Sequence, residues 1–228
     1  MDLGNPKNTI EVIQKYNFAF QKKFGQNFLI DTHVLDKIIS AAGMTKEDTV
    51  LEVGPGIGTM TQRLSQAAGQ VIAVEIDTNL IPILKDTLQD CENVTVINED
   101  ILKIDIKKLA EEKGGGRPVK VVANLPYYIT TPIIMGLFES GAPIDNITVM
   151  VQKEVAEKLT APVGTREAGA ITVAVQYYGT VTQLFSVSRG SFLPPPNVDS
   201  AVIQIQLGTP YAEQVADEKH FFRMVRSG

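Results

Sequence analysis

The stretch of sequence that decides the fold is Thr49-Val50-Leu51-Glu52-Val53-Gly54-Pro55-Gly56-Ile57-Gly58. Its first five residues are mostly apolar and predict a buried strand. The glycines predict a tight turn, after which we expect Thr59 to cap a helix running to about Ala68. A strand, a glycine-rich turn and a helix in this order are typical of nucleotide-type binding sites, because the backbone passes close to the ligand and the helix N-terminus offers free N–H groups.

Two acidic residues follow this turn at useful distances. A second strand, 71–76, reaches Glu75 about 20 residues past the glycines, where a carboxylate can accept both hydroxyls of a ribose. A third strand, 94–97, is followed by Asp100, whose carboxylate can accept an adenine amine or cap the next turn.

The pattern favours S-adenosylmethionine (SAM) over a nicotinamide dinucleotide. Gly54, Gly56 and Gly58 are spaced by two, and Thr59 stands where the dinucleotide fingerprint has its third glycine. Glu52 is awkward beside a pyrophosphate, but it suits a cationic ligand or orders the loop by hydrogen bonding. SAM carries a sulfonium and no phosphate.

A second informative stretch, Asn124-Leu125-Pro126-Tyr127, follows the apolar run 119–123. The run predicts a buried strand, and the proline ends it in a rigid turn. The Asn124 amide oxygen and the Leu125 carbonyl can accept hydrogen bonds from an exocyclic amine, while the Tyr127 ring stacks on a flat base. A loop with a satisfied asparagine and a core tyrosine is the structural alternative.

Alternating strands and helices predict the rest of the fold. We expect further helices over 32–42, with Asp31 as its cap, and over 80–88, 107–113, 131–138 and 154–159. Strands are expected over 147–151, 171–178, 181–187 and 201–207. This order indicates an α/β fold with a mostly parallel sheet and an antiparallel edge.

Composition narrows the class of protein. Hydrophobic residues make up 44% and charged residues 21% of the 228 residues, as in a globular protein with a real core. The formal net charge of −5 argues against a wholly electrostatic grip on RNA. The single Cys91 excludes an intrachain disulfide and indicates a cytoplasmic setting, and two dispersed histidines argue against a metal site. We find no run long enough to span a membrane.

Taken together, the motifs resemble the ribosomal RNA adenine N6-dimethyltransferase family of the KsgA type. The matching segments cover about residues 22 to 207 and are 24–31, 51–58, 75–77, 99–100, 124–127, 152–154 and 192–201. The resemblance implies a Rossmann-like SAM-dependent methyltransferase with a seven-stranded sheet and helices on both faces. It implies N6,N6-dimethylation of two adjacent adenosines near the 3′ end of small-subunit rRNA, linked to ribosome assembly, by a monomer.

The resemblance also assigns residues. Asn27, Leu29, Gly54, Gly56, Glu75, Asp100 and Asn124 are expected to contact SAM, and Asn124, Leu125, Tyr127 and Phe192 to form the target-base pocket. Two positions depart from the family pattern. Tyr128 stands where asparagine is usual, and Ala168 where an aromatic residue is common.

The resemblance divides the chain into three parts. We expect residues 1–21 to be an N-terminal extension, 22–208 the methyltransferase domain, and 209–228 the start of a truncated C-terminal helical domain. Three alternatives remain open at this point. They are a related large-subunit rRNA methyltransferase that confers antibiotic resistance, a non-catalytic RNA-binding assembly factor, and a nicotinamide-dependent oxidoreductase.

Overall fold

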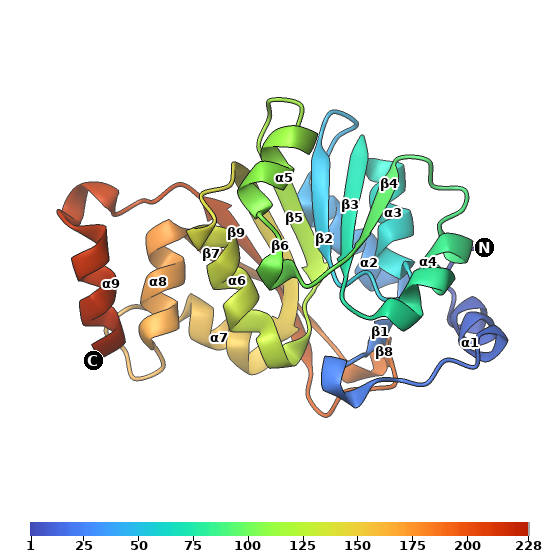
Figure 1. Ribbon diagram of the computed structural model, residues 1–228. Coiled ribbons are helices and arrows are strands. Elements are labelled where there is room, and N and C mark those ends of the chain that lie inside the picture. The colour runs from blue at the N-terminus through green and yellow to red at the C-terminus, as the bar shows by residue number, and fades with distance from the viewer. Residues whose placement is uncertain (228) are drawn as a thin grey trace.

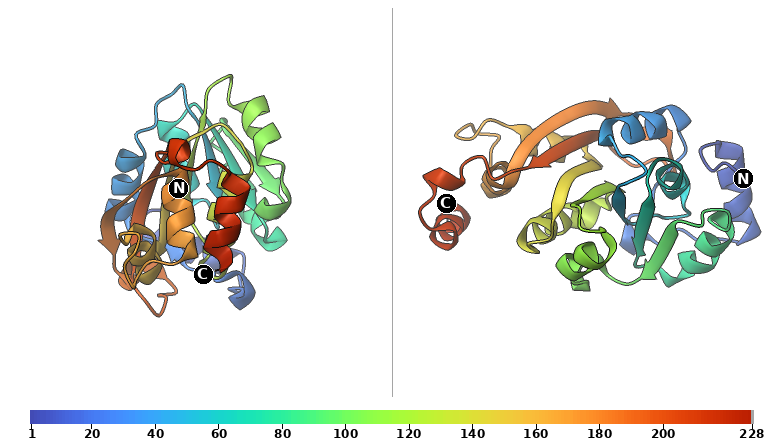
Figure 2. Two further views of the ribbon diagram at one scale, coloured as in Figure 1. Left: turned by 90° about the vertical axis from the view of Figure 1, so that its left-hand side faces the viewer. Right: turned by 90° about the horizontal axis from the view of Figure 1, so that it is seen from above.

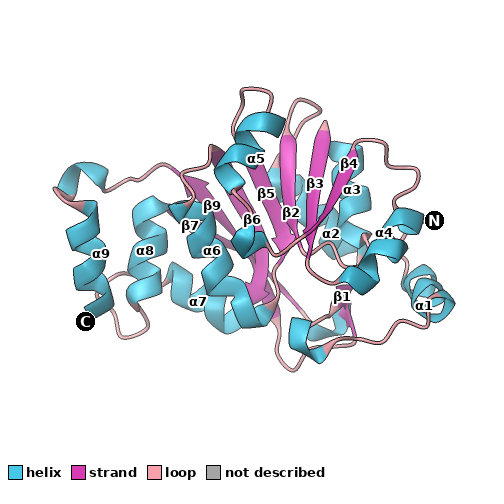
Figure 3. Ribbon diagram, viewed as in Figure 1, coloured by secondary structure: helices cyan, strands magenta, loops and turns pink. Residues whose placement is uncertain are grey.

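The computed structural model describes residues 1–227, and its centre is a twisted seven-stranded sheet (Figures 1 and 3). The strands of this sheet lie in the order β4-β3-β2-β5-β6-β9-β7. Their bounds are β2 (Thr49–Val53), β3 (Gln70–Glu75), β4 (Val94–Asn98), β5 (Val119–Asn124), β6 (Ile144–Gln152), β7 (Gly179–Val187) and β9 (Ser200–Leu207). The strands from β4 to β6 pair in parallel, whereas β9 pairs antiparallel with both β6 and β7, so the predicted architecture is confirmed.

Helices cover both faces of the sheet, as the view from above makes plain (Figure 2). The helices are α1 (Pro6–Lys15), α2 (Thr32–Ala42), α3 (Thr59–Ala67), α4 (Ile81–Thr87), α5 (Ile106–Lys113), α6 (Thr130–Glu139), α7 (Lys153–Thr160), α8 (Ala170–Tyr178) and α9 (Glu218–Ser227). One buried cluster joins α2 and α3 to the sheet, and a larger one joins α5, α6, α7 and α8 to its other face.

Among the parallel strands, β2, β3, β5 and β6 are largely buried on both faces, which explains why they appear as nearly continuous apolar runs, whereas the edge strand β4 is only partly buried. Every residue of β2 is buried, including Thr49 and Glu52. At roughly 25 cal/mol per Å² of apolar surface, such burial is the main favourable term in folding. It also fixes the carboxyl ends of β2, β3 and β5 at one edge of the sheet, where ligands bind in open α/β folds.

The N-terminal region folds against this same edge. After α1, Phe18 and Phe20 pack their rings on Phe28, with centroids 5.8 and 5.3 Å away. A 3₁₀ turn, η1 (Lys22–Phe24), leads into β1 (Phe28–Leu29), which pairs antiparallel with β8 (Phe192–Leu193). The chain start and the loop before β9 therefore meet beside the carboxyl ends of the strands.

Two local predictions were wrong. Residues 170–178 form α8 rather than a strand, and the Thr172 hydroxyl fixes the first turn by accepting from Gly169 N and donating to the Lys158 carbonyl, at 2.9 and 2.8 Å. Gly58 rather than Thr59 is the N-cap of α3, since its φ of 95° suits only glycine. α9 packs on α8, where Phe222 stacks on Tyr178 with ring centroids 5.5 Å apart.

Candidate functional site

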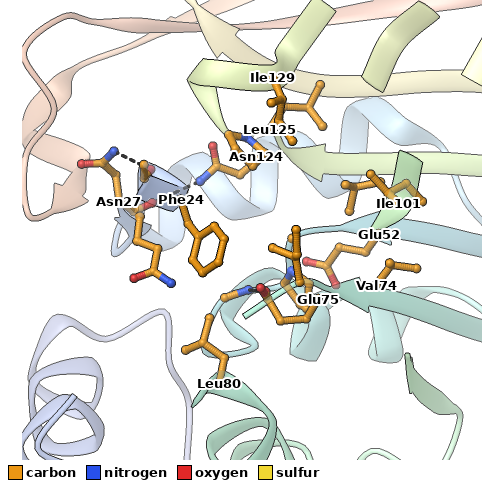
Figure 4. Close-up of a pocket in the computed structure, with 18 of the residues that line it drawn as sticks. Phe24, Asn27, Glu52, Val74, Glu75, Leu80, Ile101, Asn124, Leu125 and Ile129 are labelled. Carbon is orange, nitrogen blue, oxygen red and sulfur yellow. Dashed lines mark hydrogen bonds between the residues drawn. The ribbon is translucent and has the colours of Figure 1, made fainter. Parts of the chain in front are cut away.

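One pocket opens at the carboxyl ends of β2, β3 and β5 (Figure 4). Five segments supply most of its lining. We call residues 22–27 the arm, and its residues Phe24 to Asn27 line the pocket. The other segments are the glycine turn 54–57, the ends of β3 and β4 with the loops that follow, at 75–76 and 99–101, and the turn 124–129. The structure thus brings together segments that lie about a hundred residues apart in the sequence, and it does so at the predicted edge.

The glycine turn is shaped by backbone conformations that side chains rarely adopt. Gly54 and Gly56 have φ of 71° and 60°, and Gly54 N donates to the Val74 carbonyl at 2.9 Å. A Cβ at Gly56 would lie 3.1 Å from the Phe28 ring. Both glycines therefore hold the turn open and close to the pocket, as a tightly approached ligand requires.

Two buried carboxyl groups stand behind the turn. Glu75 accepts from Gly56 N at 3.2 Å and from Asp77 N at 2.8 Å, and burial raises its pKa to about 7. Glu52 accepts from the Thr61 hydroxyl at 2.6 Å, so it fixes α3 as well as facing the pocket. Burial raises the pKa of Glu52 to about 8, with a further contribution from the charge of Glu75.

The charges of the residues that line the pocket fit SAM. Among the described residues that line the pocket, Glu52, Glu75, Glu99 and Asp100 are acidic and none is basic. A site of this kind offers no counter-charge for a pyrophosphate but suits a sulfonium and an ammonium group. Thr59 Oγ1 is buried and has no partner among residues 1–227, so the glycine turn also offers an unused polar atom.

Asn124 lies at the end of β5 and faces the arm. Its Nδ2 donates to the Asn27 carbonyl at 3.3 Å, and this leaves Oδ1 as an acceptor within the pocket (Figure 4). Leu125 follows with a buried side chain, and its N–H donates to the Met150 carbonyl at 3.1 Å. Neighbouring strands therefore hold the turn at the position where the sequence predicted it.

The two tyrosines after Pro126 diverge. The Tyr127 hydroxyl is hydrogen-bonded to the Ser200 hydroxyl at the start of β9, and burial raises the pKa of Tyr127. Tyr128 lines the same pocket near the carboxylates of Asp100 and Glu75. We name the half with Glu75 and Asp100 the cofactor half, and the half with Asn124, Leu125 and Tyr127 the base half.

Phe192 is the one predicted site residue that does not line the pocket. It is 2% exposed and packs in the α2–α3 cluster, and its β8 position pairs with Leu29, which does line the pocket. Sequence reasoning missed a supporting contact in the arm, where Gln26 Nε2 donates to Asp77 Oδ2 at 2.7 Å. Only the proximity of Gln26 to Asn27 in the motif pointed to it.

Residues 1–227 contain no cluster of three or more His, Cys, Asp or Glu side chains arranged to hold a metal. In the same range, none of the helices has the length and apolar character needed to cross a membrane.

This fold and this pocket define a Rossmann-like, SAM-dependent methyltransferase. A family model described as ribosomal RNA adenine dimethylase matches residues 17–227, and the chain belongs to that family. It is 60% identical to a ribosomal RNA small subunit methyltransferase A of Lachnoclostridium phytofermentans, over 99% of this chain and 78% of that protein. A protein of the same name from Clostridioides difficile is 51% identical over 99% of this chain and 78% of its own length.

Two solved structures are similar at 30% identity. A dimethyladenosine transferase from Plasmodium falciparum gives a TM-score of 0.74 over 87% of this chain and 69% of that one. The 23S rRNA methyltransferase ErmE gives 0.73 over 88% and 78%. Fold similarity alone therefore does not separate the small-subunit and large-subunit branches, whereas the sequence relatives favour the small-subunit branch.

Proposed function

We propose that this protein uses SAM to dimethylate the N6 atoms of two adjacent adenosines near the 3′ end of small-subunit rRNA. The observation that carries the proposal is the Asn124 side chain, whose free amide oxygen faces a pocket that has a SAM-type cofactor half. The small-subunit names of the relatives at 60% and 51% identity support this substrate over the large-subunit alternative.

Asn27, Leu29, Gly54, Gly56, Glu75, Asp100 and Asn124 would hold the cofactor. When bound, it supplies an electrophilic methyl group on a sulfonium sulfur. Glu75 would accept the ribose hydroxyls, and Asp100 the adenine amine. Asp100 currently accepts from Leu102 N at 3.0 Å, which orients its carboxylate at the pocket rim.

The base half would orient the nucleophile. An adenine N6 lone pair is delocalised into its ring, so it attacks poorly unless the nitrogen is held towards tetrahedral geometry. Asn124 Oδ1 and the Leu125 carbonyl would accept its N–H bonds and direct the lone pair at the methyl group. Attack by N6 would form the N–C bond as the methyl–sulfur bond breaks and the neutral thioether leaves, and the cationic nitrogen would then lose one proton to water. Positioning of this kind supplies much of a rate enhancement without a strong base.

The target base must leave its stack, at a cost of a few kcal/mol. Tyr127 lines the base half, and we propose that its ring stacks on the extruded base. Phe192 is buried, and we propose that it supports the base pocket from β8, next to the pocket-lining Leu29. Aromatic stacking stabilises a bound base by roughly 1–3 kcal/mol, which offsets much of that cost.

Residues 22–208 form the methyltransferase domain in this proposal, with residues 1–21 as an extension before it and the segment that contains α9 after it. We also propose that the protein acts as a monomer in the cytoplasm. Size-exclusion chromatography with light scattering tests the monomer.

The activity is tested by transfer of tritiated methyl groups from SAM to undermodified small ribosomal subunits, with large subunits and free DNA as controls. Nucleoside analysis should give N6,N6-dimethyladenosine from the small subunit alone. Label on large subunits would overturn the branch assignment. Binding of SAM without transfer to any of these substrates would overturn the substrate assignment, and failure to bind SAM would overturn the cofactor assignment.

A further inference from the structure

Tyr128 is on the rim of the pocket and has no role in the chemistry described above. Its side chain lines the pocket and is 49% exposed. Across the rim lies Gly25 of the arm, where an added Cβ would sit 3.6 Å from Tyr128 Cδ1. The Tyr128 ring therefore closes against the arm backbone.

Tyr128 faces the cofactor half rather than the base half. Burial, followed by the charges of Asp100 and Glu75, raises the pKa of Tyr128. Both carboxylates belong to the cofactor half, whereas the neighbouring Tyr127 hydroxyl meets Ser200 on the other side. The two adjacent tyrosines thus contact different parts of one pocket.

The arm is held by few contacts. None of its η1 residues, Lys22–Phe24, is buried. The Gln26–Asp77 and Asn124–Asn27 hydrogen bonds tie it to the sheet edge, at 2.7 and 3.3 Å. Segments with little buried apolar surface open at a small free-energy cost.

We propose that Tyr128 and the arm form a gate over the cofactor half, and that the Tyr128 ring sets the rate at which the cofactor and its demethylated product exchange. This inference rests on the proposed function for its ligand. Two methyl groups on one nitrogen consume two cofactor molecules, so an exchange must separate the transfers. Because this gate does not include Tyr127, the cofactor can exchange while the target base stays in the base half.

The test measures dissociation of tritiated S-adenosylhomocysteine from preloaded protein into excess unlabelled ligand, without RNA. Tyr128→Ala should raise the dissociation rate about tenfold, a change of about 1.4 kcal/mol, in keeping with the loss of one aromatic contact. Tyr128→Phe should stay within about twofold of the unmodified chain, because the ring rather than the hydroxyl closes the gate. Tyr211→Ala is the matched control, because Tyr211 is also 49% exposed but does not line the pocket, and it should leave the rate unchanged.

An unchanged rate in a folded Tyr128→Ala protein overturns the gate. If that variant does not fold, Gln26→Ala carries the test, because releasing the arm should raise the same rate; an unchanged rate there also overturns the gate. Failure of the unmodified protein to bind the ligand would instead overturn the cofactor assignment.

Discussion

The cofactor half of the pocket rests on backbone and buried carboxylates, whereas the base half rests on the side chains of one short turn. In the cofactor half, the positive φ of Gly54 and Gly56 and the two N–H bonds to Glu75 fix the shape. In the base half, the Asn124 amide and the Tyr127 hydroxyl are each held by a single hydrogen bond. The difference indicates that affinity for the cofactor and the rate of transfer can be altered separately.

The Asn124→Ala variant should show the largest effect, and it should lower the rate of transfer much more than the affinity for the cofactor. Because the variant loses the amide oxygen that orients the attacking nitrogen, single-turnover methyl transfer should fall by about 10²–10³-fold, the usual loss for one preorganised polar contact. Cofactor affinity, measured by calorimetry, should fall less than about tenfold, since Asn124 is one of several cofactor contacts. Retention of normal transfer by this variant would remove Asn124 from the base half.

Glu75→Gln should produce the opposite pattern. Hydrogen bonds to a charged acceptor contribute about 1.5–3 kcal/mol, so the KM for SAM should rise about 10- to 100-fold. Saturating SAM should restore most of kcat, because the base half is untouched. Glu99→Gln, at the same pocket rim, is the control and should change the KM little. A fall in kcat at saturation, with KM unchanged, would show that the two halves are not separable at Glu75.

The Phe192→Leu variant tests whether the buried Phe192 ring contributes to the base half. Leucine keeps much of the apolar volume, so the variant should fold. If Phe192 supports the extruded base, kcat/KM for RNA should fall about 5- to 10-fold, near the lower end of aromatic stacking energies. A lowered melting temperature with unchanged kcat/KM would assign the ring to core packing alone.

Sequence reasoning worked best for the elements whose burial is uniform. β2 and β5 are apolar runs because helices cover both faces of the sheet, so pattern and structure agree. It failed over 171–178, where the β-branched residues Ile171, Thr172 and Val173 fit a strand or a buried helix equally well. Contacts from α7 and α9 decided in favour of the helix, and local sequence does not encode them.

The sequence predicted the site about as well as it predicted the fold. The acceptors Glu75, Asp100 and Asn124 could be placed because each follows a strand that ends at one sheet edge. The divergence of Tyr127 and Tyr128 could not, since it depends on Ser200 in β9 and on Gly25 in the arm, which lie far from them in the sequence. The burial of Phe192 likewise depends on strand pairing with Leu29.

The last prediction concerns pH and again separates the halves. The pKa of Glu52 rises from an ordinary 4.5 to about 8 in the folded protein, and that of Glu75 to about 7. Between the unfolded and folded pKa values the folded state binds more protons. The free energy of unfolding should therefore fall as pH rises from about 5 to 8, by at most about 1.4 kcal/mol per pH unit for each group.

Glu52→Gln should reduce this slope up to about pH 8, whereas Glu75→Gln should reduce it only below about pH 7. Urea unfolding at pH 5, 6, 7 and 8 measures both variants against the unmodified chain. Tyr127→Phe should leave the slope unchanged, because burial raises the pKa of Tyr127 above its usual 10, outside this range. If all the proteins show one slope, the buried carboxyls do not set the pH response, and the cofactor half owes its rigidity to the glycine turn alone.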